Sequence, residues 1–225
     1  MIPLFRYGGW AGKVLWVDLT RGKVVPRELD ESLALSFLGG TGFAAKWLWD
    51  MATPDVQPFS PENPLIFATG VLTGTIFPQA SRYVVAARSP LTDIYGEAHA
   101  AGHFAPELKF AGYDAVVFTG RSDKPVYLYV EDGGAELRDA SHLWGRTTYE
   151  AEDMIKEENG DPFIKVAVIG QAGENLVRFA CVINDHGRAA ARSGMGAVMG
   201  YKRLKAVAVR GYSAVRVARP EELYE

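Results

Sequence analysis

Alternating apolar and polar positions predict that the chain opens with a β-hairpin. In residues 13–19, KVLWVDL, apolar and polar side chains alternate with a period of two. TRG follows as a tight turn, and residues 23–29 are predicted to form the second strand of the hairpin. Short apolar segments bounded by turn residues predict further strands, at residues 65–68, 83–87, 115–119, 126–131, 164–169 and 177–183. The chain is therefore rich in β-structure.

Helical spacing appears in three places between these strands. Residues 30–38 begin at Asp30, a good N-cap residue, and end at two glycines, after which residues 42–51 restore the helical pattern. Residues 147–158 form an amphipathic pattern with glycine just beyond its end. Because paired strands alternate irregularly with short helices, we predict an α+β fold rather than a regular βαβ array.

Two distant segments of the chain resemble each other. Residues 98–122 and 189–213 are equal in length without a gap, and each contains a small-residue loop, a short predicted helix, a strand and Gly-x-Ser. Such units are common, so coincidence is the alternative to duplication. We interpret the similarity as a duplication, which predicts two similar ligand-binding loops.

Composition narrows the class of protein. The 225 residues are 48% hydrophobic and 23% charged with a formal net charge of −3, which is ordinary for a globular protein and does not favour a general nucleic-acid surface. Cys181 is the only cysteine, which excludes an internal disulfide and any cysteine-ligated cluster built by this chain alone. No signal peptide or membrane-length apolar segment is visible, so we expect a cytoplasmic location.

Residues 184–200, NDHGRAAARSGMGAVMG, carry the strongest chemical signal. Glycine and alanine let a ligand approach the backbone, and the stretch has no carboxylate after Asp185. A helix N-terminus adds roughly 1 kcal/mol for a bound anion, whereas a charge-assisted contact adds about 1.5–3 kcal/mol. We therefore expect Arg188 and Arg192 to bind a phosphate; the alternative is a packed turn with two solvated arginines.

The earlier loop offers a second set of candidates, Arg82, His99 and Gly102. His99 and His103 are four residues apart with Glu97 and Glu107 flanking them, so on one helix face they would form a zinc site. The interpretation that we prefer places His99 in the loop before the helix.

Other motifs give weaker signals. Residues 39–46, GGTGFAAK, form a third basic and glycine-rich element, or simply a helix start packed on a sheet. Walker A and GxGxxG patterns are absent, and Ser81, Ser89 and Ser193 lack the context of a catalytic nucleophile. Asp185 followed by His186 is read as a polar turn, and Cys181 as a buried position within a strand.

Eight stretches, which run nearly end to end and in order, carry a resemblance to a known family: GKVLWVDLTRGKV, FLGGTGFAAKWLWD, PFSPENPLIFATGVLTGT, SRYVVAARSPLTD, APELKFAGYDAVVFTGRSDKPVYLYV, ELRDASHLWG, VAVIGQAGENLVRFA and GRAAARSGMGAVMGYKRLKAVAV. In these stretches the chain resembles the N-terminal, pterin-binding domain of the aldehyde ferredoxin oxidoreductase family. That resemblance implies two packed mixed β-sheets with short helices, duplicated about a pseudo-two-fold axis. The sheets would form a cradle that holds two pyranopterins between them, and these would chelate one tungsten or molybdenum atom.

The resemblance also implies which residues contact the cofactor. In the family, the positions matching Arg82, His99, Ala101 and the run Ala190, Ala191 and Arg192 lie on the pterins and on phosphates bridged by Mg²⁺. Two departures are visible: His99 stands where a well-known member has asparagine, and Ala101 and Ala191 stand where it has glycine. An imidazole therefore replaces a carboxamide beside the expected magnesium ion.

Family enzymes are longer than this chain. Their further helical domains supply the cysteines of a [4Fe–4S] cluster, the substrate pocket and the acid–base residues. We expect residues 1–212 to be the cofactor domain and residues 213–225 to begin the next domain, with no catalytic residue here and no activity alone. Apolar surface left exposed by the missing domains would also permit a homodimer.

The family implies oxidation of an aldehyde to a carboxylate, with ferredoxin as the electron acceptor. One branch of the same family reduces aromatic-ring thioesters and shares FLGG and APELK with this chain, so ring reduction is an alternative. A stand-alone module that binds a phosphate or nucleotide is the non-enzymatic alternative. None of these interpretations requires a nucleic acid or a membrane.

Overall fold

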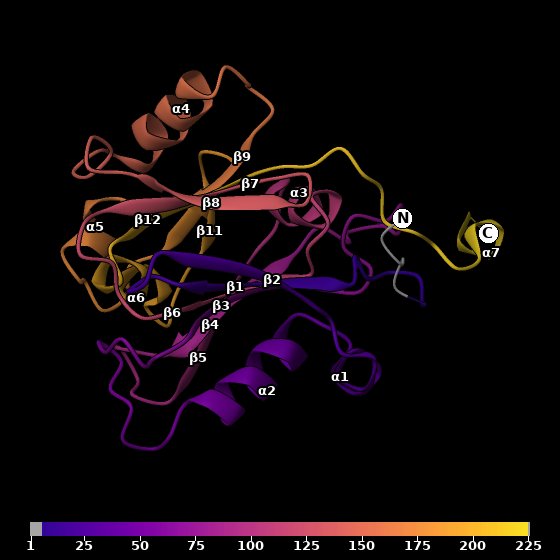
Figure 1. Cartoon of the computed structure of the whole chain (residues 1–225), viewed down its shortest axis with the longest axis horizontal. Helices are drawn as coiled ribbons and strands as arrows, with labels where there is room; N and C mark the ends of the chain where they lie inside the picture. Colours follow the sequence, from indigo (N-terminus) through magenta and orange to yellow (C-terminus); the bar gives the residue numbers. More distant parts are fainter. Residues whose placement is uncertain (1–5, 225) are drawn as a thin grey trace.

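Residues 6–224, which the computed structural model describes, form two six-stranded mixed β-sheets packed face to face (Figure 1). The α+β prediction is confirmed. The first half of the chain builds the first sheet, in the strand order β2-β1-β6-β3-β4-β5. Its elements are β1 (Lys13–Asp18), β2 (Lys23–Glu28), α1 (Glu31–Phe37), α2 (Thr41–Met51), β3 (Leu65–Thr69), β4 (Tyr83–Arg88), β5 (Tyr95–Ala100), α3 (Phe104–Phe110) and β6 (Ala115–Thr119).

The second half builds the second sheet, in the order β11-β10-β9-β12-β7-β8. A last short helix, α7 (Pro220–Tyr224), lies away from both sheets (Figure 1). The other elements are β7 (Val126–Glu131), β8 (Gly134–Asp139), α4 (Thr148–Glu158), β9 (Lys165–Val168), α5 (Gln171–Glu174), β10 (Val182–Asn184), β11 (Arg188–Ala190), α6 (Met195–Tyr201) and β12 (Leu204–Arg210).

The two sheets share one topology. In each, a hairpin (β1–β2 or β7–β8) pairs in parallel with the last strand (β6 or β12), and the three remaining strands continue antiparallel. The predicted duplication is confirmed at this level. Helices α3 and α6 begin 91 residues apart (195 − 104), as the ungapped comparison requires.

The edge strands do not keep that spacing. Ala100 pairs with Tyr83, the first residue of β4, and Ala190 pairs with Val182, the first residue of β10. The equivalent residues of β5 and β11 are therefore 90 apart (190 − 100), so the second copy has one more residue between its edge strand and its helix. The ungapped comparison is wrong by one residue within these strands.

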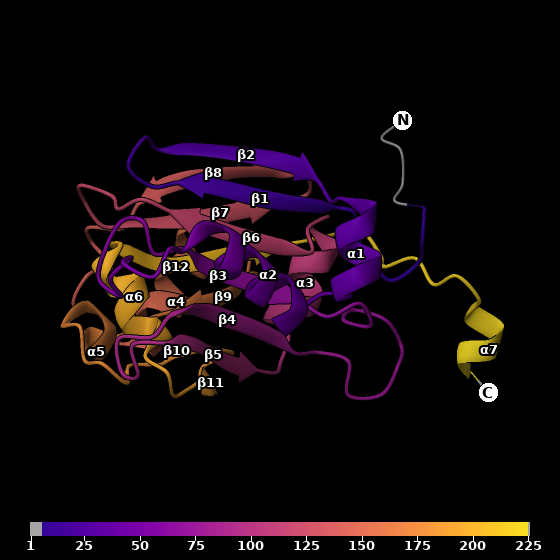
Figure 2. The same cartoon turned by 90° about the horizontal axis from the view of Figure 1, so that it is seen from below.

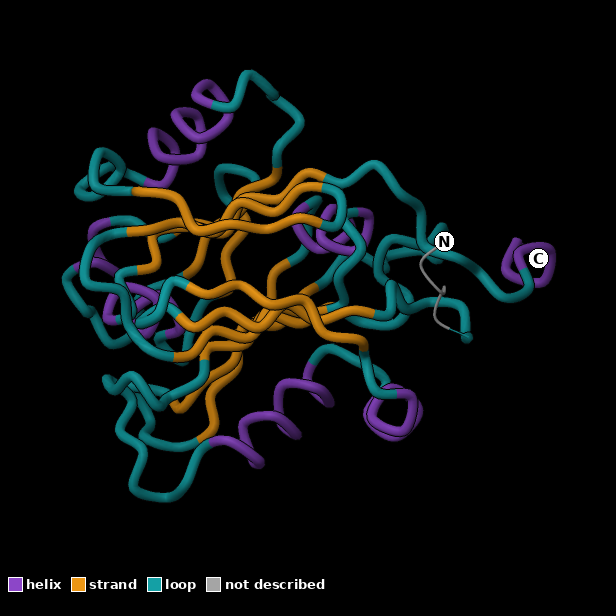
Figure 3. Tube along the Cα trace, viewed as in Figure 1, coloured by secondary structure: helices purple, strands orange, loops and turns teal. Residues whose placement is uncertain are grey.

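Apolar side chains hold the molecule in four layers. A large core between the sheets takes residues from both, including Leu15, Phe67, Val130 and Val207. The outer face of the first sheet packs on α1 and α2, and that of the second packs on α4 (Figures 1 and 3). Central strands are buried on both faces, which explains why their sequences are continuously apolar instead of alternating.

This core fills the space between the sheet faces. A ligand that both halves contact would therefore lie along an edge of the two sheets. Edge strand β2 lies beside β8, and edge strand β5 lies beside β11 (Figure 2). The second pair, together with the loops that follow its two strands, carries most of the residues predicted to contact the cofactor.

Three strands escaped prediction and one was misplaced. β5, with the sequence YGEAHA, and the three-residue β11 lack β-branched residues, so neither gave a strand signal. β8 was also missed. The strand expected at 177–183 begins only at Val182, so Cys181 lies before it and is half-buried instead of buried within a strand.

Helix α4 follows the sequence prediction closely. Thr147 caps the helix, its hydroxyl oxygen accepting the main-chain N–H of Glu150 while the Glu150 carboxylate accepts the N–H of Thr147. Within residues 6–224 no helix has the length and apolarity that a bilayer span requires.

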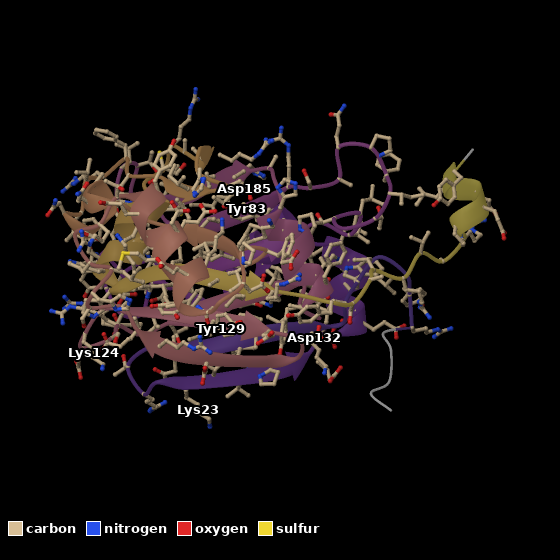
Figure 4. The ribbon with its side chains drawn as sticks, turned by 90° about the horizontal axis from the view of Figure 1, so that it is seen from above. Lys23, Tyr83, Lys124, Tyr129, Asp132 and Asp185 are labelled. Atoms are coloured by element: carbon tan, nitrogen blue, oxygen red, sulfur yellow. The ribbon has the colours of Figure 1, made fainter. Side chains whose placement is uncertain are left out.

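One buried carboxamide joins the two halves beside the β5–β11 edge. Asn184, in β10, accepts the hydroxyl of Tyr83 at 3.0 Å and donates to the carbonyl of Ala101 at 3.0 Å and to Asp185 at 3.0 Å. Tyr83 and Asp185 lie close together in Figure 4. Burial raises the pKa of Tyr83, and the charge of Asp185 adds to that shift, so the hydroxyl stays a donor.

We predict that Asn184→Leu lowers the free energy of unfolding by about 2–4 kcal/mol, because it leaves the Tyr83 hydroxyl and the Ala101 carbonyl buried without partners. Tyr83→Phe removes only the donor and should cost about 1 kcal/mol. Urea denaturation measures both. A loss below about 0.5 kcal/mol for Asn184→Leu would show that the hydrogen bonds of Asn184 contribute little to stability.

Candidate functional site

The two edge strands and the loops that follow them, residues 95–103 and 188–194, form a continuous strip that we call the seam. Ser89 donates its hydroxyl to the carbonyl of Ser193 at 2.6 Å, and Ser193 donates its own to the carbonyl of Glu97 at 3.0 Å. These serines, rejected above as nucleophiles, tie the second loop to the first edge strand. The seam is therefore built from both halves.

All the residues expected to bind phosphate lie on or beside the seam. Arg82 immediately precedes β4, next to the end of β5, because Tyr83 pairs with Ala100. His99 is on β5, Ala101 and Gly102 follow it, Arg188 and Ala190 are on β11, and Ala191 and Arg192 lead to α6. The structure brings these eight residues to one edge of the molecule, although the earlier placement of His99 in a loop is wrong.

The arginines of the seam are not neutralised. Arg82, Arg188 and Arg192 are exposed, and within residues 6–224 none of them forms a side-chain hydrogen bond or an ion pair. An exposed guanidinium without a carboxylate partner is available to an anion, and its planar fork matches phosphate oxygens. The seam therefore combines three available cations from the two halves.

The nearby carboxylate Glu97 is already occupied. It accepts the hydroxyl of Tyr95 at 2.7 Å and the Nε2 of His99 at 3.1 Å. Burial raises the pKa of Glu97, but hydrogen bonds from Tyr95, His99 and Thr41 outweigh it and hold the pKa below its ordinary value. Because an ionised carboxylate only accepts, Nε2 of His99 carries a hydrogen, and Nδ1 is the atom that remains for a ligand.

Asp185 is occupied in the same way. Its Oδ2 accepts the main-chain N–H of His103 at 2.7 Å as well as the Asn184 amide. His186 turns to Asp153, with Nε2 2.8 Å from Oδ1, and stacks on the Tyr149 ring. Asp185 and His186 thus belong to a polar turn, as the sequence indicated, and do not act as a pair.

Gly102 allows the two halves to approach. Its φ is +112°, and a Cβ built on it would lie 2.0 Å from Oδ2 of Asp185 and 2.6 Å from Cδ of Arg188. In the second loop, Arg192 and Ser193 adopt left-handed φ values of 67° and 54°. Non-glycine residues in this conformation store strain, which structures tend to concentrate at functional sites.

The zinc alternative is wrong. His99 lies on a strand, and His103 immediately precedes α3, so the two do not share a helix face. Among the described residues no three His, Cys, Asp or Glu side chains gather as a metal site. Residues 39–46 include the start of α2, where Thr41 forms a hydrogen bond with Glu97. This hydrogen bond depends on tertiary packing, so it could not be predicted from the sequence.

We predict that Gly102→Ala destabilises the protein by about 1–3 kcal/mol more than Gly112→Ala. Gly112 has a similar φ of +93° but nothing within 4 Å of its Cβ direction, so that control reports only the conformational cost of about 1 kcal/mol. Thermal or urea unfolding gives the difference. Equal losses of stability in the two variants would mean that Asp185 and Arg188 move aside to admit the methyl group at position 102.

Comparison of the chain with known proteins identifies its family. The profile described as "Aldehyde ferredoxin oxidoreductase, N-terminal domain" matches residues 14–211. The tungsten-containing aldehyde ferredoxin oxidoreductase of Pyrococcus abyssi is 51% identical over 212 residues, which are 94% of this chain and 35% of that protein. An aliphatic sulfonate oxidoreductase, WOR-like subunit, of Pyrococcus furiosus is 37% identical, over 89% of this chain and 34% of that protein.

A similar solved structure supports the same relationship. The active site complex BamBC of benzoyl coenzyme A reductase, in complex with 1,5-dienoyl-CoA, superposes with a TM-score of 0.93 at 46% identity, covering 96% of this chain and 33% of that one. The chain spans about a third of the length of the curated relatives that it matches. On this evidence the chain belongs to the aldehyde ferredoxin oxidoreductase family, in which it corresponds to the N-terminal domain.

Proposed function

We propose that this chain is the cofactor-binding domain of a tungsten or molybdenum bis-pyranopterin oxidoreductase that oxidises aldehydes to carboxylates and passes electrons to ferredoxin. The observation that carries the proposal is the seam, where Arg82, Arg188 and Arg192 have no partner among the described residues. Relatives about half identical to this chain are named as tungsten-containing aldehyde ferredoxin oxidoreductases.

The residues of the seam fit such a cofactor. Pterin phosphates are anionic, and both neighbouring carboxylates, Glu97 and Asp185, are already occupied. Gly102 lets Asp185 and Arg188 of the second half approach the first loop closely, and Ala101 and Ala191 are small enough for a ligand to approach the backbone. In this proposal the sulfur atoms of the cofactor hold the metal, as the resemblance to the family implies, and no side chain of the described residues is assigned to it.

When bound, the metal–pterin group supplies the two-electron chemistry, and the chain holds it in place. In this proposal Arg82 from the first half and Arg188 and Arg192 from the second bind the phosphates, each contact adding about 1.5–3 kcal/mol. Ala190 has no exposed surface and pairs with Val182, so we assign it no direct contact with the cofactor. His99, whose Nε2 is held by Glu97, would offer Nδ1 to the expected Mg²⁺.

The rest of the reaction would come from outside this chain. We propose that residues 1–212 form the cofactor domain and that residues 213–225 lead into a further domain; in support, β12 ends at Arg210 and α7 lies apart from the sheets (Figure 1). The missing length would supply a [4Fe–4S] cluster, the substrate pocket and the acid–base groups, so no catalytic residue is assigned here. Exposed apolar side chains such as Trp49 and Ile94 would be covered by those domains or in a homodimer.

Ring reduction of an aromatic thioester is the second candidate. The similarity to a benzoyl coenzyme A reductase complex, at 46% identity, favours it almost as much as the aldehyde oxidoreductases favour the first. Both candidates use the same cofactor domain. Assays of one full-length preparation with aldehydes and with an aromatic coenzyme A thioester separate them.

We predict that the full-length protein, purified without oxygen from its own host, contains about one tungsten or molybdenum and about four iron atoms per chain. Elemental mass spectrometry, with pterin fluorescence after oxidation, measures both. Absence of tungsten, molybdenum and iron would contradict the proposal and leave a module that binds a phosphate or nucleotide.

A second prediction concerns the arginines. In the full-length protein, Arg192→Ala should lower pterin and metal occupancy, with an affinity loss of about tenfold or more from one lost charge-assisted contact. Arg146→Ala is the matched control, because Arg146 is also exposed but lies outside the seam. Equal occupancy in the two variants would remove Arg192 from the site.

A further inference from the structure

A second positively charged site lies away from the seam. A cleft of about 450 Å³, which we call the arginine cleft, is lined by residues that include Arg121, Trp144, Glu174, Tyr201 and Arg203. Lys124 lies in the same loop as Arg121 and shows in Figure 4 where the cleft is. Tyr83 and Asp185, which lie beside the seam, are well away from Lys124 in that view. None of its lining residues belongs to the seam.

The arginines of this cleft are held by main-chain carbonyls. Arg121 donates Nε to the carbonyl of Tyr201 at 2.8 Å and lies over the Tyr201 ring, 4.9 Å from its centroid. Arg203 donates to the carbonyl of Asp123. Within residues 6–224 neither guanidinium has a carboxylate at ion-pair distance, so both are fixed in position while their charge stays uncompensated.

The carboxylate of the cleft is not available to neutralise them. Glu174 accepts Nζ of Lys205 at 2.5 Å through one oxygen and the main-chain N–H of Gly145 at 2.8 Å through the other. Behind the cleft, the buried Lys202 donates Nζ to the carbonyls of Pro61 and Gly120, but burial lowers its pKa to about 7, so the full positive charges of the cleft are those of Arg121 and Arg203. The cleft therefore has an excess of positive charge.

The equivalent positions of the two halves do not both carry these cations. With the 91-residue spacing of α3 and α6, Arg203 corresponds to Gly112 (203 − 112) and Arg121 to Tyr212 (212 − 121). Both members of the first pair are left-handed, with φ of 93° at Gly112 and 56° at Arg203. The second half therefore keeps an arginine at a strained position where the first half uses glycine, and a structural role in the turn does not explain it.

The walls of the cleft suit a flat ring. Trp144 provides aromatic surface, Pro125 and Leu176 add apolar surface, and Tyr201, whose ring is covered by Arg121 and packs beside Phe59, borders the cleft. Within the described residues the Trp144 indole N–H makes no hydrogen bond, so it remains available as a donor. We propose that the arginine cleft is a second ligand site, which binds a phosphate or carboxylate group carried on an aromatic ring.

The test uses this chain with phenyl phosphate as the probe, followed by tryptophan fluorescence and calorimetry. We expect saturable binding of phenyl phosphate, weaker binding of inorganic phosphate and no binding of phenol, because charge and ring both contribute. Trp144→Phe should keep the calorimetric signal and lose the fluorescence change. This outcome would place the ring beside Trp144.

The decisive variant is Arg203→Gly, which introduces the residue of the sister half. It should lower the affinity for phenyl phosphate about tenfold. Because glycine accepts the left-handed conformation, the variant should unfold at the same urea concentration as the parent or a higher one. Arg21→Gln is the control, since Arg21 is an exposed arginine paired with Asp18 and outside the cleft, and it should bind normally.

Three results would overturn the proposal: no saturable binding of phenyl phosphate, equal affinities in Arg203→Gly and Arg21→Gln, or loss of binding in Arg192→Ala. The last result would locate the probe at the seam and would support that anion site instead. The proposal does not depend on the proposed enzyme function, because the test needs neither metal nor pterin.

Discussion

The structure depends on the joining of two edge strands. An isolated edge strand presents unpaired main-chain groups, and here β5 and β11 lie side by side, tied by the serine hydroxyls of Ser89 and Ser193 and by the buried carboxamide of Asn184. Because the apolar core fills the space between the sheet faces, this edge is where loops from both halves can meet one ligand. The position of every seam residue follows from that contact.

Local patterns explain which parts of the fold were predictable. The hairpin, the capped helix α4 and the buried central strands each carry a signal within ten or so residues, and the repeated loop–helix–strand unit is visible without an alignment. β5 was missed because glycine and alanine line its inner face, where the opposite half packs too closely for larger side chains. The one-residue shift between the copies was missed because only strand pairing reveals it.

The candidate sites likewise contain some features with a local sequence signal and others that arise only from tertiary contacts. The arginines and small residues of the seam could be found from composition and spacing, since glycine, alanine and arginine without carboxylates indicate an anion. The occupation of Glu97 could not, because β5, which places Tyr95 and His99 on either side of it, was not predicted as a strand, and Thr41 reaches it only after α2 packs on the sheet. A net charge of −3 likewise conceals where the carboxylates are already used and where arginines remain uncompensated.

The extra residue between β11 and α6 makes the duplicated scaffold asymmetric at the positions that matter most for its ligands. By strand pairing, Ala101 corresponds to Ala191, whereas His99 corresponds to Ala189 and Gly102 to Arg192. Two identical ligands held by the two halves would therefore sit in different electric fields, one beside an imidazole and the other beside a guanidinium. A pair of chemically equal groups would then meet different side chains, without any change in the architecture that surrounds them.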